Sequence, residues 1–116
     1  MQAQVARAEA LVGAARAYLL ERVGDAWRTV CAGEALAPAQ RARVRLAITH
    51  AVRSAARAVD LAYEAAGGTA VYAASPLERC FRDVHTATQH ALVGADSDEA
   101  PGRVLLGLAP GPAPFL

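Results

Sequence analysis

Hydrophobic side chains recur every three or four residues over residues 2–32, which is the spacing of one face of a helix. Charged side chains mostly occupy the other positions. Gly33 follows as a C-terminal stop, because glycine readily adopts the backbone conformation that ends many helices. We predict one long helix over 2–32 with an apolar stripe of Val5, Ala8, Val12, Ala15, Leu19, Val23, Ala26 and Val30, widened by Leu11, Tyr18 and Trp27.

The same spacing returns from about Ala39 to Ala66, after a connector over residues 34–38. Pro38 suits the first turn of this second helix, and Gly67-Gly68 ends it. His50 has no partner at metal-ligand spacing, so we interpret it as a surface or helix-packing residue. The predicted stripe consists of Val44, Ile48, Val52, Ala55, Val59, Ala62 and Ala66.

A short linker over 69–74 leads to a third helix with a strong start signal. Ser75 is a capping residue, Pro76 fits the first helical position, and Glu78 completes a capping box. After Gly94, Asp96 or Asp98 is expected to cap a short fourth helix, and residues 109–116 form a Pro-rich tail. The apolar stripe of the third helix consists of Leu77, Phe81, Val84, Thr88 and Leu92.

These elements predict an all-α fold, an up-down helical bundle of three main helices plus a short C-terminal fourth, in one domain over 1–116. The two long helices are unusually rich in small side chains for a bundle that must seal itself. We therefore expect additional apolar surface that another copy of the chain or another domain buries.

The net charge is +1, and all twelve basic residues are arginine. So small a net charge creates no field that would attract nucleic acid or an anionic membrane. Cys31 and Cys80 are too few for a disulfide framework and are predicted to be free thiols. No segment has the pattern of a signal peptide or a membrane span. We expect a cytoplasmic protein without nucleic-acid or membrane partners.

The segment 75–90, SPLERCFRDVHTATQH, carries far more polar side chains than its surroundings. At about 100° per residue its polar residues face away from the apolar sector, with His85 at the border. His85 and His90 are five residues apart and diverge around the helix, so no metal site is predicted. Periodicity alone leaves two interpretations open, a solvated face or a face that contacts a polar partner. The face consists of Arg79, Arg82, Asp83, Thr86, Gln89 and His90, and the pairs 78/82 and 79/83 have ion-pair spacing.

One pattern resembles a known family. The chain reads EAAGG at 64–68, has Pro76 eight residues after the glycine pair, and continues LERCFRD at 77–83. This spacing resembles the C-terminal helical domain of the acyl-CoA dehydrogenase superfamily, and residues 100–108 resemble one branch of it. The resemblance covers essentially the whole chain, although the first helix matches only in pattern.

The resemblance implies a flavin enzyme that uses FAD or FMN and forms a homo-oligomer, a dimer or tetramer, through the first two helices. An N-terminal helical domain and a β-domain, or a split partner chain, would complete the flavin enclosure. Gly67 and Gly68 would approach the cofactor, since only glycine lets backbone come so close to a ligand. Arg82 would help to organise that site. The family's usual glutamine before the glycine pair is Glu64 here, a departure at the cofactor contact.

The position of the catalytic base also departs from the dehydrogenases. Many of them have a glutamate nine residues after the arginine of the Arg-Asp pair, where this chain has Ala91. His90 stands one residue earlier, which resembles the flavin-dependent monooxygenase branch, including two-component hydroxylases. Histidine exchanges a proton near neutral pH, so His90 would assist the reaction of reduced flavin with oxygen or deprotonate a phenol-like substrate.

The flavin carries the difficult chemistry, while protein supplies enclosure and orientation. A lone bundle cannot exclude water from a reduced flavin, so we expect these 116 residues alone to be inactive. The alternative is a non-enzymatic helical bundle that only oligomerises. The sequence does not identify the substrate, because its pocket draws on other segments in this family.

Overall fold

The computed structural model describes residues 1–112. In chain order the elements are α1 (Gln2–Cys31), α2 (Pro38–Ala66), the 3-10 helix η1 (Gly67–Val71), α3 (Pro76–Ala87), the 3-10 helix η2 (Ala95–Asp98) and α4 (Glu99–Leu105). No β-strand occurs in this part of the chain. The predicted all-α architecture of three main helices and a short fourth is confirmed. Residues 113–116 of the predicted Pro-rich tail lie outside the described residues.

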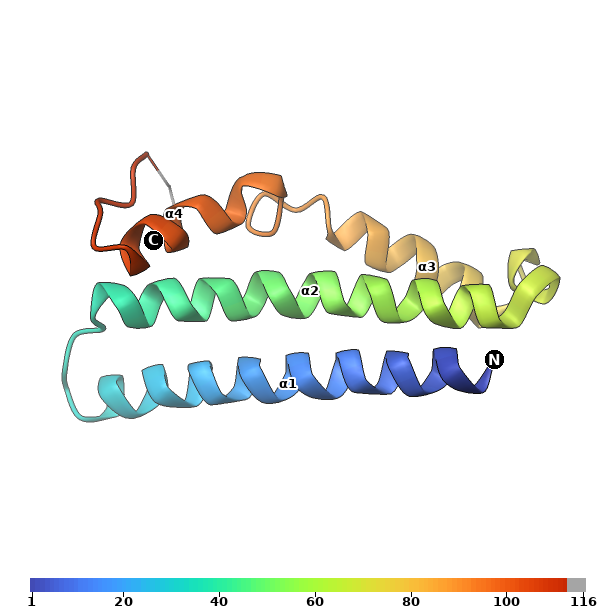
Figure 1. Ribbon diagram of the computed structural model, residues 1–116, viewed down its shortest axis with the longest axis horizontal. Coiled ribbons are helices and arrows are strands. Elements are labelled where there is room, and N and C mark those ends of the chain that lie inside the picture. The colour runs from blue at the N-terminus through green and yellow to red at the C-terminus, as the bar shows by residue number, and fades with distance from the viewer. Residues whose placement is uncertain (113–116) are drawn as a thin grey trace.

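α2 lies in the middle of the molecule (Figure 1). α1 runs antiparallel to it along one side, and α3, η2 and α4 return along the other side. Among the described residues every other element packs against α2, and α1 packs against no other element. The structure is elongated, with extents of 51 × 27 × 22 Å. No helix within residues 1–112 has both the length and the apolar composition needed to cross a membrane.

α2 is buried along two of its sides. One buried row consists of Ala42, Thr49 and Ala56, and the other of Ala47, Ser54 and Leu61. Residues seven apart lie almost two full turns apart on a helix, so each row follows one side of α2. The stripe predicted from 44 to 66 is only half-buried, because it lies off these two rows. Apart from Leu61, small residues therefore form the interfaces, while larger apolar side chains flank them.

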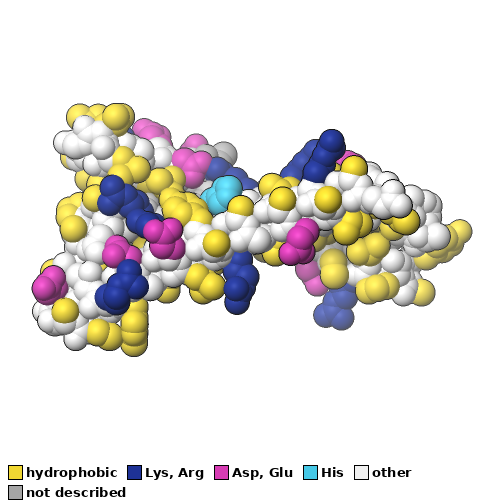
Figure 2. All heavy atoms as spheres, turned by 60° about the horizontal axis from the view of Figure 1, so that its bottom comes forward, with side chains coloured by type: hydrophobic (Ala, Val, Ile, Leu, Met, Phe, Trp, Pro, Cys, Tyr) yellow, Lys and Arg dark blue, Asp and Glu magenta, His cyan; other side chains and the backbone are white. Residues whose placement is uncertain are grey.

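The predicted apolar stripe of α1 divides in the same way. Ala15 is buried and Ala8 and Ala26 are half-buried, so the alanines occupy the side toward α2. The valines and Trp27 lie on the outer side, where Trp27 is 68% exposed, while Leu19 is half-buried. The valines of the predicted stripe therefore add little to the core, and the expected surplus of apolar surface is present (Figure 2). We call this surface the outer stripe; it consists of Val5, Val12, Leu20, Val23, Trp27 and Val30.

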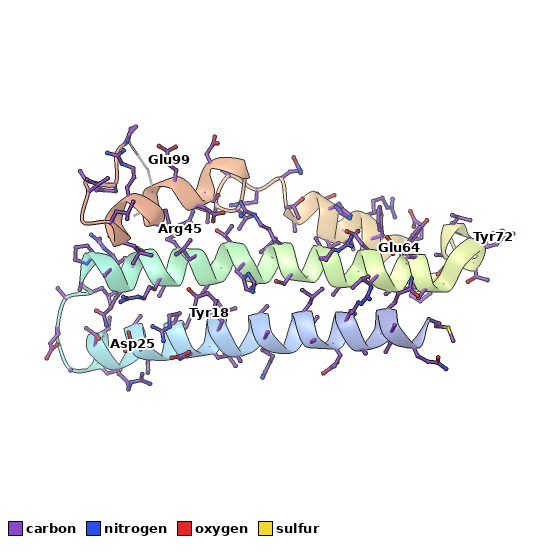
Figure 3. The ribbon with its side chains drawn as sticks, in the orientation of Figure 1. Tyr18, Asp25, Arg45, Glu64, Tyr72 and Glu99 are labelled. Atoms are coloured by element: carbon purple, nitrogen blue, oxygen red, sulfur yellow. The ribbon has the colours of Figure 1, made fainter. Side chains whose placement is uncertain are left out.

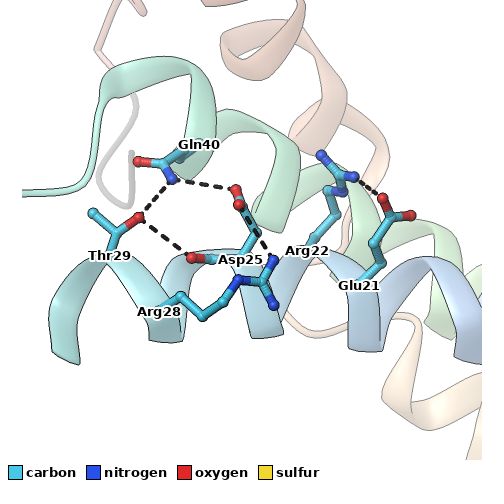
Figure 4. A network of polar contacts seen from close by, with 6 residues as sticks. All are labelled: Glu21, Arg22, Asp25, Arg28, Thr29 and Gln40. Atoms are coloured by element: carbon cyan, nitrogen blue, oxygen red, sulfur yellow. Dashed lines mark hydrogen bonds and ion pairs between the residues drawn. The ribbon is translucent and has the colours of Figure 1, made fainter. Parts of the chain in front are cut away.

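A polar network holds α1 and α2 together beside the turn that joins them (Figure 4). The Gln40 Nε2 group donates to Asp25 Oδ2 at 3.2 Å and to Thr29 Oγ1 at 2.9 Å. Its Oε1 atom accepts the Ala37 N–H at 3.0 Å. Gly33 ends α1 as predicted, with a φ of 77°. The side chain of Gln40 in α2 thus bonds to two residues of α1 and to the residue that precedes α2.

The predicted signals between α2 and α3 are largely confirmed. Gly67 ends α2 with a φ of 57°, and the predicted linker begins as the 3-10 helix η1. Ser75 caps α3, because its hydroxyl oxygen accepts the Leu77 N–H at 3.3 Å. Glu78 does not complete a capping box; its carboxylate pairs with Arg82 instead. Asp98 likewise makes no side-chain cap for α4 and pairs with Arg53.

α3 is shorter than its apolar stripe suggested, since it ends at Ala87 and turns occupy residues 88–93. The Thr88 hydroxyl donates to the His85 carbonyl at 2.6 Å. The N–H groups of Gln89 and His90 bond to carbonyls only three residues back, at Thr86 and Ala87. A local hydroxyl bond of this kind competes with helical bonding and helps to end the helix. Thr88 and Leu92 therefore lie beyond α3, in a compact turn.

Replacing Gln40 with Ala removes three hydrogen bonds from the turn between α1 and α2. We expect the free energy of unfolding of the chain to fall by about 1–2 kcal/mol. Urea denaturation followed by circular dichroism measures this change. The matched control is Gln2→Ala at an exposed position, which should stay within about 0.5 kcal/mol of wild type. Equal stability of the two variants would contradict the role of Gln40.

The two adjacent glycines should respond differently to alanine. Gly67 has a positive φ, so Gly67→Ala should cost about 1–3 kcal/mol of stability. Gly68 lacks a positive φ, and a Cβ there would meet no atom within 4 Å. Gly68→Ala should therefore leave the stability of the chain unchanged within about 0.5 kcal/mol. Denaturation of both variants tests the difference, and equal losses would show that Gly68 also serves the internal packing.

Candidate functional site

The predicted site residues lie along α3 and at both of its ends. Gly67 and Gly68 precede α3 at the end of the molecule where Figure 3 labels Tyr72, and His90 follows α3 on the other side. Twelve residues of helix at 1.5 Å each separate these ends by about 18 Å. The structure therefore does not gather the glycines, Arg82 and His90 into one pocket. It distributes them along one edge of the bundle.

The polar face of α3 is exposed and internally paired. Arg82 Nε lies 3.3 Å from Glu78 Oε1, and Arg79 Nε lies 3.5 Å from Asp83 Oδ2. Both pairs have the predicted i,i+4 spacing. The side chain of Arg82 is 68% exposed, so this ion pair is screened by water and adds little stability. Arg82 is therefore available to a partner at small energetic cost.

His85, predicted at the border of the two faces, belongs to the packing between α2 and α3. Its Nε2 group donates to Asp60 Oδ1 at 2.8 Å. Its ring lies 4.5 Å from the ring of Phe81, which in turn lies 4.7 Å from the ring of Tyr63. This histidine connects two helices, and its Nε2 atom is already bonded.

His90 is exposed in the turn that follows α3. The Leu92 N–H donates to His90 Nδ1 at 3.2 Å, so Nδ1 acts as an acceptor. In the neutral ring one nitrogen accepts and the other carries the proton, which places the proton on Nε2. The ring is thus prepared to donate a hydrogen bond through Nε2 from an accessible position.

Two arginines of α2 bind the segment that carries His90, and sequence reasoning missed both contacts. Figure 3 shows Arg45 extending from α2 toward the side of α4. Arg45 Nη2 donates to the Leu92 carbonyl at 2.7 Å, and Arg53 Nη2 donates to the Gly94 carbonyl at 3.1 Å. These partners are more than forty positions away in the chain, so no local pattern identifies them.

A hollow of about 270 Å³ opens between α1, α2 and η2, lined by Tyr18, Leu46, His50, Arg53 and Asp98. The rings of Tyr18 and His50 meet edge to face with centroids 6.0 Å apart, as expected for a helix-packing histidine. None of the four predicted site residues lines this hollow. Within the described residues no three side chains of His, Cys, Asp or Glu gather as metal ligands would.

The sequence is similar to one protein family and to several enzymes. Residues 1–95 match the family of the acyl-CoA dehydrogenase C-terminal domain. Indole-3-acetate monooxygenase of Pseudomonas putida is 38% identical over 111 residues, which cover 96% of this chain and 28% of that protein. The same enzyme name belongs to a relative from Acinetobacter baumannii that is 33% identical over the same shares of both chains.

A further relative is HsaA, the oxygenase subunit of a flavin-dependent monooxygenase of Mycobacterium tuberculosis, which is 31% identical over 88 residues. This match covers 76% of the chain and 22% of HsaA. The chain thus spans 28% or less of the length of these relatives. The family inferred from the glycine pair and the Pro-Glu-Arg-Arg-Asp pattern is confirmed: the chain belongs to the acyl-CoA dehydrogenase C-terminal domain family, and its relatives include flavin-dependent monooxygenases.

Proposed function

We propose that residues 1–116 form a single C-terminal bundle domain of a flavin-dependent monooxygenase, which closes over a reduced flavin held by other domains. The observation that carries this proposal is the exposed His90, with Nδ1 occupied and Nε2 left as donor, on a chain that is related over most of its length to monooxygenases. The rings of His85 and His50 contact Asp60 and Tyr18 respectively, whereas the exposed ring of His90 is oriented by a main-chain N–H and presents its Nε2–H as a hydrogen-bond donor. The free, exposed thiols of Cys31 and Cys80 suit the reducing cytoplasm.

The exposed glycines fit a cofactor that approaches the backbone. Gly68 is exposed, has no positive φ, and an added Cβ would meet only open space. The internal packing of this chain therefore gives no reason for glycine at 68, while close approach of FAD or FMN does. Arg82 supplies a guanidinium that is held only by an exposed ion pair. When bound, the flavin would supply the oxygen chemistry, and this chain would orient it, exclude water and donate a hydrogen bond from His90 Nε2.

The enclosure would require partners beyond this bundle. The match to 28% of the Pseudomonas monooxygenase leaves room in that protein for domains that this chain does not contain. We propose an N-terminal helical domain and a β-domain, in the same or a separate chain, as the partners that hold the flavin. The polar face of α3 would then contact those domains rather than water.

The outer stripe supports association between copies of the bundle. It follows one side of α1 over nearly its whole length, and Val5 and Trp27 are 60% and 68% exposed. Exposed large apolar side chains gathered on one side of a molecule mark interaction surfaces. We propose a homodimer or homotetramer in which α1 supplies most of the contact and α2 borders it.

The same stripe favours the second candidate, a helical module that oligomerises without taking part in catalysis. The two candidates differ at His90. An oligomerisation module does not need an exposed imidazole in a turn far from the outer stripe, whereas the monooxygenase domain does.

A chimera tests the catalytic proposal. We would join residues 1–116 to the N-terminal part of the Pseudomonas putida monooxygenase, in place of the part that they match. Turnover of indole-3-acetate with reduced flavin should require His90, and His90→Ala should lower kcat by roughly 10²–10³-fold, the usual range for losing one hydrogen-bond donor that stabilises charge developing in the transition state. His50→Ala is the matched control and should leave kcat unchanged. Full activity of the His90→Ala chimera, or turnover by residues 1–116 alone, would refute the proposal.

Charges placed on the outer stripe test self-association. Val12→Glu together with Val23→Glu should weaken the oligomer by roughly a hundredfold or more, because each buried valine contributes about 1.5 kcal/mol or more. Ala10→Glu with Ala17→Glu places the same charges on exposed positions of α1 outside the stripe and should have little effect. Sedimentation velocity over a range of concentrations gives the oligomeric state. A wild-type chain that stays monomeric throughout would exclude this interface.

A further inference from the structure

The turn that carries His90 is bound to α2 by two arginines. We call residues 88–98 the His90 loop. Arg45 Nη2 reaches the Leu92 carbonyl at 2.7 Å, Arg53 Nη2 reaches the Gly94 carbonyl at 3.1 Å, and Arg53 Nη1 pairs with Asp98. Arg45 and Arg53 are eight residues apart, so they project from the same side of α2 two turns apart. The two arginines of α2 thus hold the loop at Leu92, Gly94 and Asp98.

The loop between these contacts is compact. Val93 is 7% exposed, and its N–H donates to the His90 carbonyl at 2.9 Å. The His90 N–H bonds to the Ala87 carbonyl at 3.2 Å and the Ser97 N–H to the Gly94 carbonyl at 3.1 Å. Hydrogen bonds to a charged donor are stronger than those between neutral groups, so the arginine contacts are the strongest polar bonds that anchor this loop to α2.

Leu92 connects Arg45 to the imidazole of His90. The Leu92 carbonyl accepts from Arg45, while the Leu92 N–H donates to His90 Nδ1 at 3.2 Å. Without the Arg45 bond, only the Val93–His90 hydrogen bond and the burial of Val93 hold the Leu92 main chain, so its N–H should be held less firmly against the ring. A ring without a fixed partner populates both neutral tautomers and several orientations.

We propose that Arg45 and Arg53 are positioning residues that act through the His90 loop. Arg45 sets the Nε2–H tautomer and the orientation of His90, and Arg53 holds the far end of the turn at Gly94 and Asp98. This proposal rests on the proposed function for its catalytic meaning, but the arrangement itself does not. It assigns His90 the role of a hydrogen-bond donor through Nε2, because an Nδ1 atom that accepts the Leu92 N–H is not free to take a proton from a substrate.

Conservative substitutions separate positioning from folding. Arg45→Met keeps an unbranched apolar stem but removes the donor, whereas Arg45→Lys keeps one donor for the single carbonyl at Leu92. Arg53→Lys cannot replace both contacts of the guanidinium, so it should rescue less well than Arg45→Lys. Arg43→Met is the matched control, since Arg43 is exposed on α2 and makes no hydrogen bond or ion pair among the described residues.

Nuclear magnetic resonance of the full 15N-labelled chain tests the arrangement without flavin. Above neutral pH, the imidazole nitrogens of wild-type His90 should show the Nε2–H tautomer alone, with a slowly exchanging Leu92 amide. Arg45→Met should speed exchange of that amide by about tenfold or more and give a mixture of tautomers, because one charge-assisted hydrogen bond is lost. Arg45→Lys and Arg43→Met should resemble wild type. A folded Arg45→Met chain with wild-type exchange and tautomer would overturn the proposal.

The chimera gives the catalytic readout of the same variants. Arg45→Met should lower kcat by about tenfold with little change in the KM for flavin, and Arg45→Lys should restore most of kcat. An unchanged kcat in Arg45→Met would overturn the positioning role even if the tautomer shifts. Should His90→Ala itself retain full activity, the proposed function would fail, while the resonance experiment would still decide whether Arg45 orders the loop.

Discussion

The structure depends on the double burial of α2. Every other element of the described chain packs against this one helix, so α2 must present two sides to which other helices can come close. Alanine meets that requirement because it adds little bulk and loses no side-chain entropy in a helix. Ala42 and Ala47, which are 0% exposed, lie in the two opposite rows. A large residue at either position would push away the neighbour that packs on that side of α2.

This arrangement explains why apolar surface remains on α1. A helix in a closed bundle has neighbours on two sides, whereas α1 has only α2. Ala8, Ala15 and Ala26 face that neighbour, and the valines and Trp27 are left on the outer stripe. The same choice of small residues that allows close packing at α2 therefore leaves the larger side chains exposed among the described residues.

The sequence was sufficient for features that depend on neighbouring residues. Gly33, Gly67 and Ser75 end or cap helices through bonds to residues a few positions away, and all three were predicted. It was insufficient where a distant partner decides the outcome. The spacing of apolar residues indicated where α1 lies but not which part of the stripe meets α2.

For the candidate site, too, the sequence was sufficient for local features and insufficient for contacts between distant residues. The motif around Gly67, Gly68 and Arg82 identified the family, yet the Arg45 contact with Leu92 joins positions that no pattern in the chain connects. Thr88 was assigned to the stripe of α3, but its hydroxyl bonds to the His85 carbonyl and the helix ends one residue earlier. Hydrogen bonds of individual side chains are decided by geometry that periodicity does not contain.

The segment 75–90 contains two histidines with different roles, one within α3 and one beyond its end. His85 lies on the last turn of the helix, packs against Phe81 and donates to Asp60, so its ring serves the contact between α2 and α3. His90 lies in the turn after the helix, where its ring is exposed and accepts the Leu92 N–H. Had α3 continued to Leu92, the Leu92 N–H would have bonded to the carbonyl of Thr88 along the helix and would not have been free to bond to His90 Nδ1. Ending the helix at Ala87 is thus what permits a main-chain N–H to orient the ring of His90.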